Sequence, residues 1–298
     1  MGDAQAVRTL SHNANPQLRR HSGGKDRMET AGMLQSVGNL EGMLIGATDG
    51  TIGKVRDFYF DDEAWVVRYA VVDTTAWLPG RKVLVSPYLI GEPVFGAGVL
   101  PVSVTQERIR HSPDVDTDKP VSRQYEESYL GYYGYPVYWG GSGLWGQYGY
   151  PGTISNGMIP SAYRGPLRTP TAAAPGADPH LRSCNAVKGY HIHAADGEIG
   201  HVGGYLLDGH TWSLRYLVVN TSNWWLGHDV LISPEWVQDL SWHESMVYLS
   251  LPRQMIRDAP AYDDNAPLDR AAEHRLFTHY GRDAYWRTPA SPTEETMR

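Results

Sequence analysis

The chain lacks several features that mark common protein classes. It contains one cysteine, Cys184, among 298 residues, which excludes a disulfide scaffold and a metal site built from several cysteines. No window of about 18 residues is both apolar and uncharged, so we expect no transmembrane helix. The first ten residues, MGDAQAVRTL, contain no apolar segment of the kind found in secretory signals. We therefore expect a cytoplasmic protein.

Positive charge is also scarce. The net charge is −7, and the isoelectric point is about 5.9. Proteins that bind duplex DNA carry a basic face, so this composition argues against DNA as a partner and makes RNA an unexpected one. Apolar residues make up 41% of the chain and charged residues 20%, which is ordinary for a folded protein.

What the chain does contain is an internal duplication. The segment DGTIGKV at 49–55 returns as DGEIGHV at 196–202, and WVVRYAVVDT at 65–74 returns as WSLRYLVVNT at 212–221. Both pairs are 147 positions apart (196 minus 49), and the register continues without a gap to 139 and 286. A repeat of this length indicates two homologous domains in tandem, because solenoid repeats are much shorter.

The duplication sets the predicted domain boundaries. Both repeats are acidic, with 9 basic and 14 acidic residues in 40–139 and with 7 and 13 in 187–286. The segments outside them are polar or rich in Gly, Pro, Ala and Tyr, a composition typical of tails and linkers. We predict a disordered tail at 1–36, repeat 1 at 37–139, a linker at 140–184, repeat 2 at 185–286 and a short tail at 287–298.

Each repeat predicts several short strands followed by a helix. The Asp-Gly pairs at 49–50 and 196–197 predict hairpin turns. Gly53 and Gly200, inside the strands that follow, predict a bulge or a tight bend. The run 65–73 alternates like a central strand, and further strands are expected at 82–85, 99–104 and 246–251. Ser122 and Asp269 are suitable N-caps for helices near 123–132 and 270–279. The predicted fold is mainly β, with two small closed or half-open barrels, each followed by a short helical extension.

These motifs resemble a known family. The pattern Asp-Gly-x-Ile-Gly-x-Val, an acidic turn, Trp-x-x-Arg-Tyr-x-Val-Val and a later Ser-Pro is similar to the PRC-barrel domain over about 40–113 and 187–260. That domain forms the cytoplasmic barrel of the photosynthetic reaction-centre H subunit and the C-terminal barrel of a ribosome-maturation factor. The helical extensions ending in Tyr-Trp resemble those of bacterial tandem PRC-barrel proteins. The resemblance implies a module that docks on a larger complex, without naming that complex.

The candidate site residues are mostly aromatic or arginine. Arg68 and Arg215 lie inside apolar strands and need a partner, for which a strand-end carboxylate such as Asp57 is our prediction and a bound ligand the alternative. Residues 125–150 hold eight tyrosines, and 140–150 is the better interface candidate because repeat 2 lacks it. The candidate partner-binding residues are Arg68, Arg215, Trp77, Trp224, Trp225, Tyr138, Trp139, Trp145 and Tyr148.

Signals for catalysis are weak. His191 and His193 would share one face of a strand and could begin a metal site, but repeat 1 has Leu44 and Gly46 there, which favours surface histidines. Asp61 and Asp208 recur at turns, where they cap the backbone. Cys184 has no activating base nearby in sequence, so we expect a passive thiol.

The sequence therefore predicts a non-enzymatic docking or regulatory module, without a cofactor, that binds a protein complex or associates with itself. Three alternatives remain open. The first is a peripheral accessory of a photosynthetic or electron-transfer complex at the cytoplasmic face of the inner membrane. The second is a ribosome or RNA maturation factor. The third is a metal-dependent enzyme that uses His191 and His193.

Overall fold

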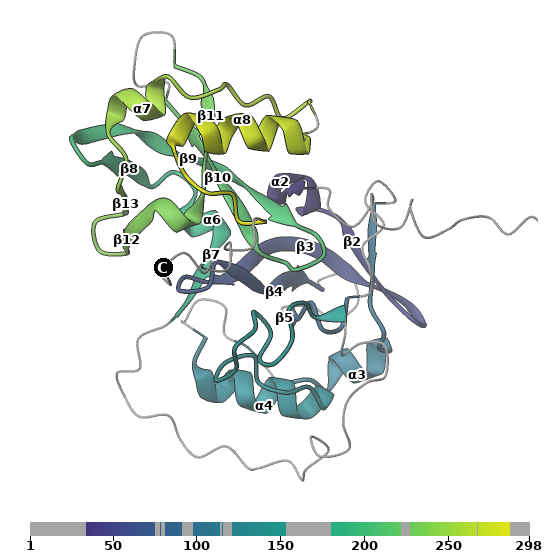
Figure 1. The fold of residues 1–298 in the computed structure, drawn as a ribbon. Helices are drawn as coiled ribbons and strands as arrows, with labels where there is room; N and C mark the ends of the chain where they lie inside the picture. Colours follow the sequence, from purple (N-terminus) through teal and green to yellow (C-terminus); the bar gives the residue numbers. More distant parts are fainter. Residues whose placement is uncertain are drawn as a thin grey trace, which may run out of the picture.

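The structure is a computed structural model that describes residues 34–74, 78, 81–90, 98–113, 115, 121–152, 180–221, 227–266 and 268–286. These residues form two mixed β-sheets, one for each repeat, with helices α4 (Arg123–Tyr133) and α8 (Arg270–Tyr280) on opposite outer sides (Figure 1). The predicted mainly β class is confirmed.

The first sheet has the strand order β5-β4-β3-β2-β6, and β7 pairs with the far end of β3. Neighbouring strands are antiparallel, except that β2 and β6 run parallel. Its strands are β2 (Leu44–Ala47), β3 (Gly50–Asp61), β4 (Val66–Asp73), β5 (Lys82–Val85), β6 (Val99–Pro101) and β7 (Leu181–Ser183).

The second sheet repeats this plan with the order β11-β10-β9-β8-β13-β12, and β1 pairs with the far end of β9. Here the parallel pair is β8 and β13. Its strands are β1 (Leu34–Ser36), β8 (His191–Ala194), β9 (Gly197–Asp208), β10 (Leu214–Asn220), β11 (Asp229–Ile232), β12 (Val237–Ser241) and β13 (Met246–Leu249).

The predicted hairpins and glycine positions are confirmed. Both Asp-Gly pairs lie at the turn into the long strand, β3 or β9, and the hairpin register shifts close to Gly53 and Gly200. A Cβ atom on Gly53 would lie 2.0 Å from the carbonyl oxygen of Asp73, and one on Gly200 would lie 2.1 Å from that of Asn220. Only glycine lets the neighbouring strand approach this closely.

The predicted helices are also confirmed. The Ser122 hydroxyl accepts a hydrogen bond from the Tyr125 amide at the start of α4, and Asp269 accepts one from the Ala272 amide at the start of α8. Both helices end at a glycine in the left-handed conformation. The shorter helices are α2 (Val37–Leu40), α3 (Gln106–Arg110), α6 (Cys184–Val187), η2 (Pro234–Trp236) and α7 (Arg253–Arg257).

The two repeats exchange a strand. β1 precedes repeat 1 in the chain but pairs with β9 of repeat 2, where Leu34 lies opposite Asp208. β7 precedes repeat 2 but pairs with β3 of repeat 1, where Leu181 lies opposite Asp61. Leu181 lies 147 positions after Leu34 in the chain, and Asp61 lies 147 positions before Asp208. The exchange is therefore reciprocal, and each sheet is completed by the other repeat.

This exchange corrects two predicted boundaries. Residues 34–36 were assigned to the N-terminal tail and 181–183 to the linker, but both segments are strands. The strands with which they pair lie in the other repeat, so no sequence pattern within one repeat predicts these two strands. Among the described residues, neither sheet closes on itself: the first ends at β5 and β6, and the second at β11 and β12.

An approximate two-fold axis passes between the repeats. Val66 forms a β-bridge with Ser213, its own counterpart at the offset of the duplication. The Val67 amide donates to the Trp212 carbonyl, and the Leu214 amide donates to the Trp65 carbonyl, each at 2.8 Å. Trp65 and Trp212 have φ angles of 54° and 60°, a left-handed conformation that costs a side-chain-bearing residue about 1 kcal/mol or more. The strained backbone therefore occurs at Trp65 and Trp212, whose carbonyl groups accept the hydrogen bonds that join the repeats.

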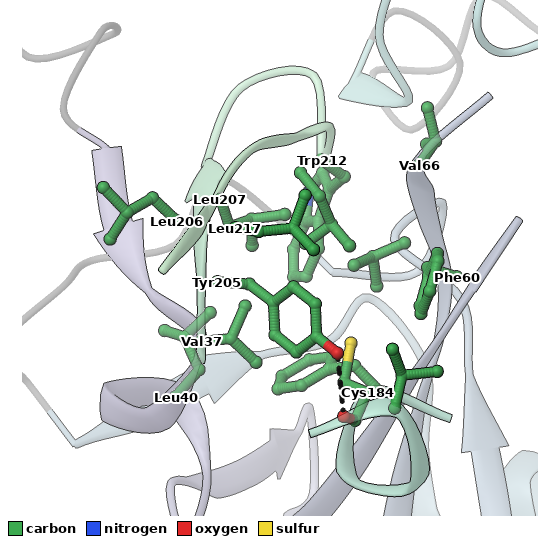
Figure 2. Close-up of a cluster of buried hydrophobic side chains, with 14 of the residues drawn as sticks. Val37, Leu40, Phe60, Val66, Cys184, Tyr205, Leu206, Leu207, Trp212 and Leu217 are labelled. Carbon is green, nitrogen blue, oxygen red and sulfur yellow. Dashed lines mark hydrogen bonds between the residues drawn. The ribbon is translucent and has the colours of Figure 1, made fainter. Parts of the chain in front are cut away.

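The repeats also share a hydrophobic core. Figure 2 shows Phe60 and Val66 of repeat 1 in one cluster with Tyr205 and Trp212 of repeat 2 and with Cys184. The ring centroids of Phe60 and Tyr205 lie 6.1 Å apart, and the Tyr205 hydroxyl donates to the Cys184 carbonyl. All five side chains are buried. Because burial of each large apolar side chain stabilises by about 1.5–3 kcal/mol, this shared core holds the repeats together.

No helix within the described ranges has the length and apolar character needed to cross a bilayer.

Candidate functional site

The two-fold axis generates a pair of equivalent sites, one around Arg68 and one around Arg215. In the Arg68 site, the guanidinium pairs with Asp61 at 3.3 Å and donates to the Leu144 carbonyl at 2.6 Å. It lies 3.9 Å from the ring centroid of Tyr138 and 4.9 Å from that of Trp145. The Arg68 side chain is only 3% exposed. Its charge is thus balanced by a carboxylate and by two aromatic faces.

In the second site, Arg215 keeps the same partners from its own repeat. Its guanidinium pairs with Asp208 at 3.0 Å and lies 4.4 Å from the ring centroid of Tyr285. A cavity of about 680 Å³ opens beside it, and the side chain is 22% exposed. We call this cavity the Arg215 cleft. Its lining comes from both repeats and includes Glu63, Trp65, Arg182, Ser213, Arg215, Glu235, Asp239 and Tyr285.

In each site, a buried glutamate of the outer helix accepts a hydrogen bond from the tyrosine that contacts the arginine. Glu126 accepts a hydrogen bond from Tyr138 and lies 2.8 Å from Nε2 of His180. Glu273 accepts hydrogen bonds from Tyr216 and Tyr285 and pairs with Arg270 at 2.8 Å. These contacts fix the tyrosine rings against which the two arginines lie. Our sequence analysis did not identify these glutamates; their identity in both repeats, within a helix, is the signal that finds them.

The pKa shifts at the two sites keep Tyr138 and Tyr285 neutral and Asp208 ionised at neutral pH. Burial, together with the Glu126 carboxylate, raises the pKa of Tyr138. Burial and Glu273 raise the pKa of Tyr285 to about 12. Burial would raise the pKa of Asp208, but the Arg215 guanidinium and the hydrogen bonds from Thr211 together lower it. All three shifts move the group away from neutral pH, which is the opposite of what a general acid or base requires.

The predicted partner of Arg68 was wrong. Asp57 instead accepts hydrogen bonds from the Ser183 hydroxyl and the Asn185 amide, and so anchors the exchanged strand β7. Asp61 pairs with Arg68, as Asp208 pairs with Arg215. The predicted turn role of these two aspartates is confirmed as well, since each accepts two backbone amides of its turn. One carboxylate therefore caps the turn and neutralises the arginine.

The aromatic segment 140–150 is partly buried against repeat 2 and partly exposed, with Tyr150 at its exposed end. Trp145 is fully buried, and its indole nitrogen donates to the Thr211 carbonyl of repeat 2 at 2.8 Å. Tyr138 is buried and Tyr148 and Trp139 are half-buried. The expected packing of Tyr138 against the sheet is confirmed. Composition could not distinguish an external interface from one within the chain.

The remaining candidates are not brought to this site. Trp77, Trp224 and Trp225 lie outside the described residues. His191 is exposed and His193 is half-buried, both on β8, and neither lines the Arg215 cleft. The described residues contain no group of three or more His, Cys, Asp or Glu side chains that could hold a metal ion. Cys184 is buried in the shared core, and burial raises the pKa of its thiol, which suppresses reactivity.

No protein-family model matches the chain, and a search of curated proteins finds no similar sequence. A functional assignment therefore rests on the geometry of the two sites.

Proposed function

We propose that the protein is a non-enzymatic docking module of the tandem PRC-barrel type, which binds a partner protein at its repeat interface. The residues that resemble the family form the β2–β3 hairpin, β4 and β5 in repeat 1, and equivalent strands in repeat 2. These segments fold into mixed sheets of the same strand order in both repeats. We propose a cytoplasmic location on the sequence evidence given above.

The Arg215 cleft is the observation that carries the proposal. It lies where the repeats meet, and its volume of about 680 Å³ falls within the ~300–1,000 Å³ typical of ligand pockets. It is lined by two arginines and two aromatic side chains, the residue types that dominate binding hot spots. Because the shifted pKa values move away from neutrality, this lining is better suited to binding than to proton transfer.

A crosslinking experiment in the native cells tests the proposal. The tagged full-length chain is captured after mild crosslinking, and crosslinked peptides are identified by mass spectrometry. We expect one dominant protein complex, with crosslinks to residues at the rim of the cleft. Recovery of the chain alone, or of partners crosslinked only at distant positions, would contradict a docking role for this site.

A further inference from the structure

We infer that the Arg215 cleft binds a basic, tryptophan-bearing peptide segment of a partner protein, in the way that the Arg68 site binds residues 143–148 of this chain. This inference rests on the proposed docking function and specifies its ligand. The internal segment is the template, because the two sites are related by the duplication.

Four groups around the indole of Trp145 have counterparts at the Arg215 cleft. The indole contacts the Arg68 guanidinium, the Tyr138 ring and the Tyr88 ring, the last with centroids 4.8 Å apart, and donates to the Thr211 carbonyl. The counterparts of these four residues at the offset of 147 are Arg215, Tyr285, Glu235 and Ala64, and all four line the Arg215 cleft. The cleft is therefore bordered by the counterparts of the residues that surround Trp145, and Leu144 of the internal turn lines it as well.

The internal ligand is a compact turn. The Gly143 amide donates to the Gly146 carbonyl, and the Trp145 amide donates to the Tyr148 carbonyl. A Cβ atom on Gly143 would lie 2.4 Å from the Tyr148 carbonyl oxygen, so the turn needs glycine there. A short glycine-flanked turn thus presents one indole to the site and one carbonyl, that of Leu144, to Arg68.

The described residues of repeat 2 contain no such turn. The chain continues after Trp286 as RTPASPTEETMR, which contains no aromatic residue. The Nη1 group of Arg215, equivalent to the atom of Arg68 that donates to Leu144, has no partner among the described residues. The site offers an aromatic face and a donor. In repeat 1 the Trp145 indole packs against the equivalent face and the Leu144 carbonyl accepts from the equivalent donor, and residues 291 and 292, at the same offset, are Ser and Pro.

Charge specifies the ligand further. Glu235 replaces Tyr88, and Glu63 takes the position that His210 holds in the other repeat. Arg182 and Arg215 are already paired with Asp62 and Asp208. Glu63, Glu235 and Asp239 are exposed at the cleft and make no ion pair with any described residue. The remaining charge of the cleft is negative, so a basic segment complements it.

A peptide titration tests the inference. The probe is a fluorescent decapeptide, GSGLWGKYGK, which is the sequence of residues 141–150 with lysine in place of Gln147 and Tyr150. It is titrated with the full-length chain and followed by fluorescence anisotropy. We expect saturable binding that weakens about tenfold or more when the peptide tryptophan is replaced by alanine. Glu235→Lys in the protein should weaken binding by a similar factor.

Matched controls exclude trivial effects. Glu198→Lys makes the same charge change at an exposed position of β9 that does not line the cleft, and it should leave binding unchanged. Glu63→Lys provides a second cleft variant should Glu235→Lys fail to fold, which thermal melts establish. The unmodified 141–150 peptide should bind more weakly than the lysine-bearing probe.

Several results would overturn the inference. Binding that survives both cleft variants, or that does not depend on the tryptophan, would place the peptide elsewhere. Tighter binding to a chain ending at Trp286 would show that its own C-terminal residues fill the cleft, and a dimer broken by Glu235→Lys would show that a second copy does. If the peptide fails to bind while the crosslinked complex is still captured at the cleft rim, the ligand is wrong but the docking function stands. If the peptide fails to bind and no complex is captured at the cleft rim, the proposed docking function is wrong as well.

Discussion

Val66 and Ser213 occupy the same position in the two repeats and form a β-bridge with each other at the repeat interface. A residue can face its own counterpart only near a two-fold axis, so the chain is arranged as a homodimer would be, within one polypeptide. Strands β1 and β7 cross this axis in opposite directions. The two repeats should accordingly behave as one folding unit.

Cutting the chain between the repeats should not separate them. A protease site introduced near residue 165 would yield two fragments, each containing the strand that completes the other fragment's sheet. We expect the fragments to co-elute in size-exclusion chromatography after cleavage and to unfold in one transition. Fragments that elute separately under native conditions would show that the exchanged strands do not hold the repeats together.

The bend glycines should be intolerant of a methyl group. Gly53→Ala or Gly200→Ala places Cβ about 2 Å from a backbone oxygen, so the long strand must move away from its neighbour. We expect a loss of about 2 kcal/mol or more of unfolding free energy in urea denaturation. Gly38→Ala is the control, because its Cβ would meet only the Ser36 hydroxyl oxygen at 3.6 Å. A similar loss at Gly38 would mean that contact distance is not the cause.

Trp145 should contribute far more to stability than an exposed tryptophan. Trp145→Ala removes a fully buried indole and should cost about 3–5 kcal/mol. Trp242, at 47% exposure, is the matched control and should cost less than about 1 kcal/mol. Comparable losses for the two variants in thermal and urea unfolding would contradict the burial of Trp145.

The Asp208–Arg215 pair should make stability depend on acidity. The pKa of Asp208 is lower in the folded protein than its ordinary value of 3.8, so its ionised form stabilises the fold above that value. Asp208→Asn should therefore cost about 1–3 kcal/mol at neutral pH. The difference between variant and wild type should shrink as the pH falls through 3.8 and below. A difference that persists unchanged near pH 2 would show that the ion pair is not its origin.

The thiol of Cys184 should report on opening of the shared core. Burial raises the pKa of the thiol and shields it, so a disulfide reagent such as Ellman's should react slowly with the native protein and rapidly in urea. Cys184→Val should be tolerated, because Val37 fills the equivalent position in repeat 1 and is equally buried. Immediate labelling of the native protein would contradict the buried position of Cys184.

Much of the local structure could be predicted because local rules control it. Asp-Gly turns, the two strand glycines and the caps Ser122 and Asp269 act on residues a few positions away, and each recurs in both repeats. Arg68 and Arg215 were recognised as needing partners because each stands in an apolar strand. The predicted partner Asp57 has Gly204 as its counterpart, so that pairing could not be shared by both repeats, whereas Asp61 recurs as Asp208. In the fold, Asp57 turns toward the exchanged strand instead.

The sequence by itself determined the duplication, the mainly β class and the main hairpins and outer helices of each repeat, since these follow from periodicity and turn chemistry. Only the tertiary structure decided how the repeats relate. Strand exchange, the Val66–Ser213 bridge and the burial of Trp145 depend on hydrogen bonds and packing between residues far apart in the chain. The same reason explains the cleft: two equivalent sites became different because a turn after repeat 1 fills one, and the sequence of repeat 2 contains no equivalent turn.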